Sequence, residues 1–205
     1  MFISLEGLDC SGKTTQATLL VNRLQQLGKG VLLVREPGGT AISEKIRVIL
    51  LDNRHHEMSQ KAELFLFSAA RTQLVVQVIR PALEQGTIVI CDRFHDSTAA
   101  YQGYGRGLHL EDVHRINAIA TGGTIPDMTL FIDIEVDEIA RRQLRASQSA
   151  DRMESAGREF YERVRQGFRA IANNEPKRFT IINGMNSAES IHTEIWNIFQ
   201  QRFLS

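Results

Sequence analysis

Short apolar stretches alternate with longer amphipathic stretches along the whole of this chain. The short stretches are rich in Val, Ile and Leu and predict β-strands at Phe2–Glu6, Val31–Arg35, Thr87–Asp92, Met128–Asp133 and Phe179–Asn183. Apolar residues at helical spacing predict helices at Ala17–Leu27, Lys61–Glu84, Glu111–Ala120, Val136–Ala146, Gly157–Asn173 and Ala188–Phe203. Pro81 should kink or shorten the end of the second of these helices. The alternation predicts an α/β fold with a five-stranded parallel sheet flanked by helices.

A glycine-rich segment joins the first predicted strand to the first predicted helix. It fits the pattern of a phosphate-binding P-loop and consists of Gly7, Leu8, Asp9, Cys10, Ser11, Gly12, Lys13, Thr14 and Thr15. In such a loop the backbone N–H groups face the phosphates, the Lys side chain approaches the β- and γ-phosphates, and the Thr hydroxyl binds Mg²⁺. We therefore expect a site for a nucleoside triphosphate, although a glycine-rich turn with an exposed Lys13 would show the same pattern.

Length and composition narrow the class of protein. The chain has 205 residues, of which 42% are hydrophobic, so we expect one domain spanning residues 1–205. Lys and Arg number 24, as do Asp and Glu, and this balance argues against a general nucleic-acid binder. No apolar run has the length of a membrane span, the first strand leaves no room for a signal peptide, and two cysteines give no disulfide framework. These features predict a cytoplasmic protein that binds neither nucleic acid nor membrane.

Charged residues follow two of the predicted strands directly. Arg35 and Glu36 end the second strand, and Asp92 and Arg93 end the third. Binding sites of parallel sheets lie at the carboxyl ends of the strands. In this position Asp92 is expected to support Mg²⁺, partly through water, and Arg93 to bind a phosphate. For the first pair, an ordinary turn with an exposed ion pair is an equally good interpretation.

Small and hydroxylic residues follow the third strand. Ser97, Thr98, Tyr101 and Gln102 stand close together here and supply the few placed polar groups that a small-molecule pocket needs. We expect a loop of residues 96–103 that lines a pocket. The alternative is a helix that begins at Asp96 or Ser97 and continues along the surface.

Phe67 and Arg71 lie four residues apart in the predicted helix Lys61–Glu84, so they share one helix face. Phe67 could stack on a flat ring, and Arg71 could donate to the edge of that ring. A core phenylalanine beside a solvated arginine is the more ordinary explanation of this spacing.

Arginines gather in a late segment of the chain. They surround a small, polar stretch at residues 146–150 and are Arg141, Arg142, Arg145, Arg152 and Arg158. Such a composition is typical of a mobile lid, which we expect at about residues 142–155. Arginines on a lid can close over phosphates and neutralise charge in the transition state. The alternative is a solvated helix face.

Taken together, these motifs resemble those of the thymidylate kinases, and in particular their bacterial form. The resemblance rests on the P-loop with Asp9, on Arg35–Thr40, on Phe67 with Arg71, on Asp92–Gly103 and on Asp151–Glu154, in this order. It implies a P-loop fold like that of the nucleoside monophosphate kinases. It also implies transfer of the γ-phosphoryl group of ATP to dTMP with Mg²⁺, making dTDP in dTTP synthesis for DNA replication, by a homodimer.

The resemblance implies a role for each matched residue. Phe67 stacks on thymine and Arg71 bonds its carbonyl edge, while Ser97 or Thr98, with Gln102, frames the base. For the sugar and phosphates, the implied residues are Tyr101 near the 2′ carbon, Asp9 at the 3′-hydroxyl or a metal-bound water, Arg93 and Arg35 at the acceptor phosphate, and Glu36 as a further substrate-binding residue.

One P-loop residue sets this chain apart from relatives of another type, which carry a basic residue where Cys10 stands. The catalytic cation should then come from the lid, and Arg145 is the expected residue, with Arg142 as the alternative. Phe94 also stands where Tyr or His is common in the family.

Two other functions fit the P-loop. One is a kinase for a deoxynucleoside or a different monophosphate, and the other is a nucleotide switch that docks a partner. Arg93 together with Arg35 favours an acceptor that already carries a phosphate. The many residues expected on the acceptor side disfavour a switch.

Overall fold

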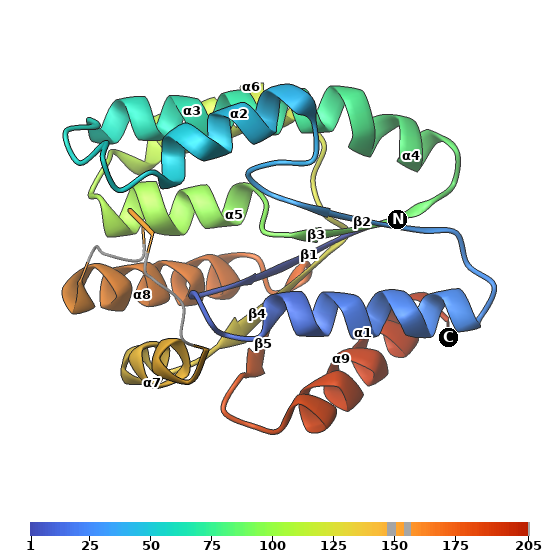
Figure 1. Cartoon of the computed structure of the whole chain (residues 1–205). Coiled ribbons are helices and arrows are strands. Elements are labelled where there is room, and N and C mark those ends of the chain that lie inside the picture. Colours follow the sequence, from blue (N-terminus) through green and yellow to red (C-terminus); the bar gives the residue numbers. More distant parts are fainter. Residues whose placement is uncertain (147–150, 154–156, 205) are drawn as a thin grey trace.

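The protein is described by a computed structural model that covers residues 1–146, 151–153 and 157–204. Its centre is one five-stranded sheet in which all neighbouring strands are parallel (Figure 1). The strands in spatial order are β2 (Val31–Arg35), β3 (Ile88–Asp92), β1 (Phe2–Gly7), β4 (Met128–Asp133) and β5 (Phe179–Asn183). All five predicted strands are confirmed. The inner strands β1, β3 and β4 are buried on both sides, as in a parallel sheet, while the edge strands β2 and β5 are partly exposed.

Helices cover both faces of the sheet (Figure 1). On one face, α1 (Lys13–Gln26) and α9 (Ala188–Phe203) pack against Ile3, Leu5 and Leu130. The other helices are α2 (Ala41–Leu51), α3 (Gln60–Leu74), α4 (Arg80–Glu84), α5 (His95–Thr98), α6 (Leu110–Thr121), α7 (Val136–Ala146) and α8 (Arg158–Asn174), with π-helical segments η1 (Val75–Ile79) and η2 (Ala99–Gly105). Of these, α3, η1, η2 and α8 bury apolar residues on the opposite face. This layering places the loops after β1, β2 and β3 together at one edge.

The segment after β3 was predicted as a loop, but it is helical. Residues 95–105 form α5 and then η2, and Ser97, Thr98, Tyr101 and Gln102 are buried, whereas the alternative interpretation placed such a helix on the surface. Small residues allow this helix to press against α8: a Cβ on Gly105 would lie 2.6 Å from the Phe160 ring, and one on Gly167 would lie 2.7 Å from the Tyr104 ring. The close contact packs η2 tightly against α8, and residues 99–103 are buried.

Pro81 neither ends nor shortens the long helical stretch. Helical residues continue from Gln60 to Glu84, and Pro81 lies in the first turn of α4. The wider turns of η1 come just before it, where a missing N–H and a bulky ring would otherwise disturb the ladder. By length and composition Gln60–Glu84 would also suffice to cross a membrane. Here it buries Leu64, Leu74 and Ile79 among the other elements, as core helices do.

The helix α2 was not predicted. Thr40 caps its N-terminus, and the Thr40 side chain accepts a hydrogen bond from the Ser43 backbone N–H. Only Ser43 and Leu50 are buried in it, although Ile42, Ile46, Ile49 and Leu50 recur at helical spacing in the sequence. The helix nevertheless matters for function, because it carries Arg47 to the site.

Candidate active site

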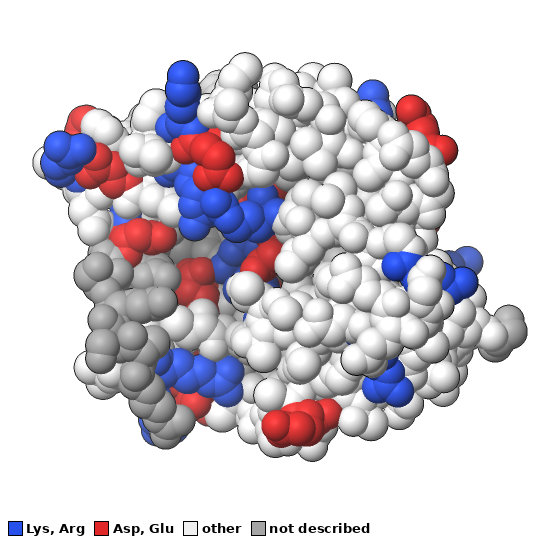
Figure 2. Space-filling view, turned by 45° about the vertical axis from the view of Figure 1, so that its right-hand side comes forward, with Lys and Arg blue, Asp and Glu red and all other residues white. Residues whose placement is uncertain are grey.

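Charged side chains gather around a hollow at the carboxyl ends of β1, β2 and β3 (Figure 2). The hollow has two adjoining parts. The P-loop pocket is lined by Asp9, Cys10, Gly12, Lys13, Thr14, Thr15, Arg35, Glu36, Arg47, Asp92, Arg93 and Arg142. The inner pocket is lined by Asp9, Glu36, Pro37, Arg47, Leu51, Phe67, Arg71, Arg93, Ser97, Thr98, Tyr101, Gln102, Asp151 and Met153. Two compartments that share one wall suit a reaction between two substrates.

The P-loop has the backbone that its sequence predicts. Gly12 adopts a left-handed conformation just before α1 begins at Lys13. Gly7 must be a glycine, because a Cβ there would lie 2.7 Å from the Ile132 carbonyl oxygen. The loop leads directly into the N-terminus of α1, where the helix dipole favours anions.

Lys13 lies buried in this loop and donates from Nζ to the Leu8 carbonyl at 2.7 Å. Burial and the nearby charge of Arg93 together lower the pKa of Lys13 to about 8. Asp92, Asp9 and Glu6 act in the opposite direction. A polyanion that binds here would therefore favour the protonated form of Lys13.

Thr14 and Asp92 bring two oxygen ligands together at the mouth of the P-loop. The Thr14 hydroxyl donates to Asp92 Oδ2 at 2.5 Å, although the two residues are far apart in sequence. Among the described residues no group of three or more His, Cys, Asp or Glu is placed to hold a metal. This pair fits Mg²⁺, which binds hard oxygen atoms and takes its remaining ligands from water and phosphates.

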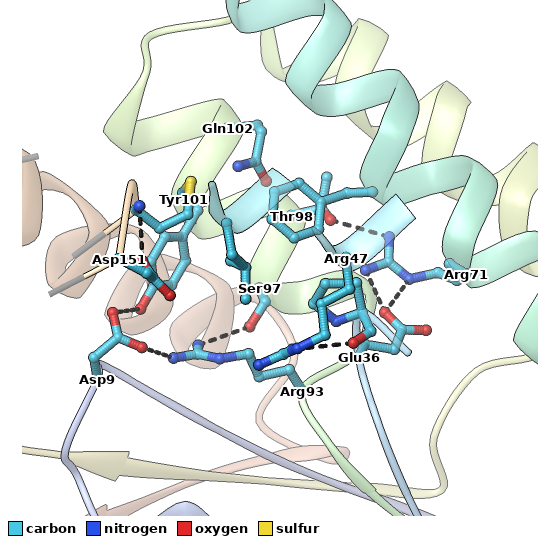
Figure 3. Close-up of a pocket in the computed structure, with 14 residues that line it drawn as sticks. Asp9, Glu36, Arg47, Arg71, Arg93, Ser97, Thr98, Tyr101, Gln102 and Asp151 are labelled. Atoms are coloured by element: carbon cyan, nitrogen blue, oxygen red, sulfur yellow. Dashed lines mark hydrogen bonds and ion pairs between the residues drawn. The ribbon is translucent and has the colours of Figure 1, made fainter. Parts of the chain in front are cut away.

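Arg93 stands where the two pockets meet (Figure 3). Its Nη2 pairs with Asp9 Oδ1 at 2.5 Å, and its Nη1 donates to the Gly7 carbonyl at 2.8 Å and to Ser97 Oγ at 3.2 Å. The backbone of Arg93 is left-handed, with φ of 72°, which is costly for a residue with a Cβ. This conformation turns the guanidinium away from the path of β3 and toward the P-loop.

Glu6 supports this turn and was missed in the sequence. It is completely buried at the end of β1, and it accepts from the Phe94 backbone N–H at 2.7 Å and from the Ser97 hydroxyl at 2.5 Å. Burial raises the pKa of Glu6 to about 8, and the nearby carboxylate of Asp96 contributes. A charged residue within an otherwise apolar strand was the signal that could have found it.

Asp9 receives three donors from different parts of the chain. Besides Arg93, the Tyr161 hydroxyl donates to Asp9 Oδ2 at 2.8 Å and the Tyr101 hydroxyl does so at 3.4 Å. Burial alone would raise the pKa of Asp9, but Arg93 and Lys13 outweigh it and the pKa is lowered. Tyr161 comes from α8, and its position in the sequence gave no sign of a contact with the P-loop.

The inner pocket brings together most of the residues predicted to bind the acceptor. Phe67, Ser97, Thr98, Tyr101 and Gln102 all line it. Figure 3 shows the polar ones of these pointing into the space between η2, α3 and the end of β3. Motifs that lie thirty residues apart in sequence therefore form one wall.

Arg71 also lines this pocket but is almost fully buried, with 1% of its surface exposed. Each guanidinium nitrogen already has a protein acceptor: Glu36 Oε2 at 2.8 Å, Thr98 Oγ1 at 3.0 Å, Asn117 Oδ1 at 3.1 Å and the Phe94 carbonyl at 3.2 Å. A direct bond from Arg71 to a base stays a prediction. Thr98 Oγ1 accepts from Arg71, so the Thr98 hydroxyl hydrogen is a second donor that this wall can offer to a ligand.

Glu36 leaves one polar atom without a partner. Its Oε2 pairs with Arg71, while its buried Oε1 accepts no hydrogen bond from the described residues. Burial raises the pKa of Glu36 and Arg71 opposes this shift. An unmatched buried acceptor at a pocket wall is costly in the free protein and indicates a donor supplied by a ligand.

Arg35 lies farther from the inner pocket than expected. It lines the P-loop pocket but not the inner pocket, pairs with Glu44 at 2.9 Å and is about half exposed. Arg47 of α2 lines both pockets and donates to the Pro37 carbonyl at 3.0 Å. Sequence reasoning missed Arg47 because it did not predict the helix that carries it.

The helix α7 brings one lid arginine to the P-loop. Arg142 donates to the carbonyls of Cys10 at 3.2 Å, Ser11 at 3.3 Å and Gly184 at 2.9 Å. Arg145 lies at the end of α7, and its side chain is outside the described part of the structure. Residues 147–150 and 154–156 of the predicted lid lie outside it as well.

Comparison with known proteins assigns this arrangement to a family. The family model described as thymidylate kinase matches residues 5–195. The chain belongs to the thymidylate kinase family. The match confirms the resemblance found in the motifs, and it covers both pockets and the helices that line them.

Individual thymidylate kinases match over nearly the whole chain. The protein from Pelotomaculum thermopropionicum is 45% identical over 194 residues, which cover 95% of this chain and 90% of that protein. The protein from Chlorobium luteolum is 46% identical over 211 residues, covering 99% and 98%. A crystal structure of thymidylate kinase from Ehrlichia chaffeensis superposes with a TM-score of 0.79 at 37% identity and covers 98% of both chains. The fold predicted for a P-loop monophosphate kinase is thereby confirmed.

Binding of ATP at pH 8 should take up protons through Lys13. With a pKa of about 8, this side chain is roughly half protonated there, and the triphosphate favours the charged form, so we expect uptake of roughly half a proton. Calorimetry in buffers of different ionisation enthalpy measures the uptake. Lys13→Arg is the control, because its guanidinium stays charged; equal uptake by both proteins at pH 8 would contradict the lowered pKa.

Proposed function

We propose that this chain transfers the γ-phosphoryl group of ATP to dTMP and releases dTDP and ADP. Membership of the thymidylate kinase family supports the reaction. The observation that carries the proposal is the position of Arg93, between a P-loop pocket and an inner pocket with an aromatic and polar wall. A fixed cation at the junction of two such pockets suits two substrates that meet through their phosphates.

The inner pocket would hold dTMP. We assign the base to the wall formed by Phe67, Thr98 and Gln102, with Ser97 and Arg71 behind it. Tyr101 and Asp9 lie toward the P-loop, where the sugar would stand, and the unmatched Oε1 of Glu36 is a further acceptor for a ligand donor. The acceptor phosphate would then lie against Arg93, with Arg47 and Arg35 around it.

The P-loop pocket would hold ATP together with Mg²⁺. Thr14 and Asp92 would hold the ion, which neutralises charge on the phosphates when it is bound. Lys13 and the backbone N–H groups before α1 would face the triphosphate. Arg142 lies on the outer side of this loop, bonded to its carbonyls.

Positioning and charge neutralisation account for most of the catalysis in this proposal. The acceptor is an anionic phosphate, so no general base is needed to create the nucleophile. The obstacle is the repulsion between two polyanions, and Arg93, Lys13, Arg47 and Arg142 surround the place where they meet. Because Asp9, Gly7 and Ser97 already hold the Arg93 guanidinium, little reorganisation is needed when the phosphates arrive.

The cellular setting that we propose is dTTP synthesis in the cytoplasm. Neither Cys10 in the P-loop nor Cys91 in β3 forms a disulfide, as expected in a reducing compartment. The chain contains no disulfide framework that would require an oxidising one.

Assays with a panel of acceptors test the proposed reaction. A coupled assay for ADP should show dTMP as the preferred substrate and dUMP as a poorer one, because a single methyl group gives only about 10–200-fold discrimination. Thymidine, which lacks the phosphate that Arg93 would bind, should be inactive. Preference for a nucleoside would support the rival deoxynucleoside kinase, and silence toward all acceptors despite ATP binding would support a nucleotide switch.

Replacing Arg142 tests the contribution of α7. Arg142→Ala should lower kcat with little change in dTMP affinity, by on the order of a hundredfold or more if the guanidinium turns from the loop carbonyls to the phosphates. Arg141→Ala on the same helix is the matched control, because Arg141 is exposed and pairs with Glu138 at 3.6 Å. Arg145→Ala should be measured in parallel; a large loss there with near-normal turnover in Arg142→Ala would assign the catalytic cation to Arg145.

We further propose a homodimer, formed by the helices far from α1 and α9. Exposed apolar side chains gather on α2, α3 with η1, and α6, and they are Ile42, Val48, Ile49, Phe65, Val76 and Ile119. Sedimentation should show a dimer that Val48→Glu converts to a monomer. Leu27→Glu replaces an exposed apolar residue at the end of α1 and should leave the dimer intact. A monomeric wild-type protein at micromolar concentration would contradict this arrangement.

A further inference from the structure

Glu63 of α3 collects hydrogen-bond donors behind the inner pocket. Its side chain is 1% exposed. Gln102 Nε2 donates to its Oε1 at 2.9 Å, Arg106 bonds both oxygens at 3.1 Å, and Arg152 Nη1 lies 2.7 Å from its Oε2. Glu63 does not line the pocket, so its effect on a ligand must pass through the residues that it holds.

The bond from Gln102 decides which way its amide faces. An ionised carboxylate only accepts, so the Gln102 amide must present its NH₂ group to Glu63. Gln102 lines the inner pocket, and its Oε1 accepts no hydrogen bond from any residue that the structure describes. The atom left for the pocket is therefore the carbonyl oxygen (Figure 3).

The hydrogen bonds to Glu63 favour its ionised form. Burial alone would raise its pKa, but the hydrogen bonds from Arg106, Gln102 and Arg152 outweigh this effect and the pKa is lowered. Arg106 is in turn held over the Phe160 ring at 4.6 Å. The carboxylate is therefore ionised at neutral pH, where it can only accept hydrogen bonds.

A carbonyl oxygen at this wall distinguishes pyrimidine bases by their N3 position. Thymine and uracil carry an N3–H donor, whereas N3 of cytosine is an acceptor. We propose that Glu63 is a positioning residue that sets the base preference of the inner pocket by holding the Gln102 carbonyl toward N3–H. This inference rests on the proposed use of the inner pocket for dTMP.

The same carboxylate also ties down a neighbouring wall. Arg152 donates from Nε to the Leu50 carbonyl at 2.7 Å, and its neighbours Asp151 and Met153 line the inner pocket. Glu63 therefore supports the pocket from two sides, through η2 and through residues 151–153. Only the contact with Gln102 selects between a donor and an acceptor on the base. The test must therefore separate the effect through Gln102 from the effect through residues 151–153.

The variant Glu63→Gln keeps the shape and removes the charge. One amide oxygen would then have to serve Arg106, Arg152 and Gln102, and Gln102 would be released to turn its NH₂ group into the pocket. The ratio of kcat/KM for dTMP to that for dCMP should fall by on the order of tenfold or more, mainly through a higher KM for dTMP. The KM for ATP should not change.

Arg106→Gln is the matched control. It removes a charged partner of Glu63 but leaves the bond from Gln102. The melting temperature should fall, while the dTMP-to-dCMP ratio should stay at the wild-type value. A wild-type ratio in Glu63→Gln, or an equal fall in both variants, would overturn the proposal. A wild-type enzyme that does not phosphorylate dTMP would instead overturn the proposed function.

A measurement on the wild-type protein covers the case in which Glu63→Gln does not fold. The side-chain NH₂ signals of Gln102, assigned by their loss in Gln102→Leu, should exchange slowly with solvent in NMR spectra of the free protein. They should remain protected when dTMP binds, because the base contacts the oxygen. Rapid exchange in the free protein, or a new contact from this NH₂ group to bound dTMP, would overturn the proposal.

Discussion

The ion pair between Arg93 and Asp9 is the interaction on which the geometry of the site depends. Asp9 follows β1 and Arg93 follows β3, and these strands are neighbours in the sheet, so the pair joins the P-loop to the floor of the inner pocket. It also holds a left-handed backbone at Arg93 that the residue would not adopt by itself. Removing either partner would leave a largely buried charge without compensation, which is strongly destabilising. Donor and acceptor sites are thus parts of one electrostatic unit.

Three buried glutamates hold the side chains that surround this ion pair. Glu6 accepts hydrogen bonds from Phe94 and Ser97, which follow Arg93. Glu36 holds Arg71, and Glu63 holds Gln102 and Arg152. A buried carboxylate is tolerable when several donors surround it, and Glu6 and Glu63 meet that condition with donors from other elements. Glu36 pairs with Arg71, and its second oxygen has no partner among the described residues. The pocket wall is therefore organised before any substrate arrives, which lowers the entropic cost of binding.

Much of the fold and part of the site could be predicted from the sequence. The five strands were recognisable because each is short, apolar and bounded by turn residues, and the P-loop was recognisable because its contacts are local. The helix α2 was missed although Ile42, Ile46, Ile49 and Leu50 recur at helical spacing, and η2 was taken for a loop because small residues hide its periodicity. Contacts such as that between Tyr161 and Asp9 join residues far apart in the chain and leave no pattern in either segment.

The close approach of η2 to α8 limits which substitutions this sequence can accept during evolution. At Gly105 and Gly167 the neighbouring aromatic rings occupy the space of a first side-chain carbon, so even alanine would push the two helices apart. The helix that would be displaced carries Tyr101 and Gln102, and its partner carries Tyr161. Substitutions at these two glycines are therefore not neutral, although neither residue lines the pocket. We expect them to reduce activity before they prevent folding.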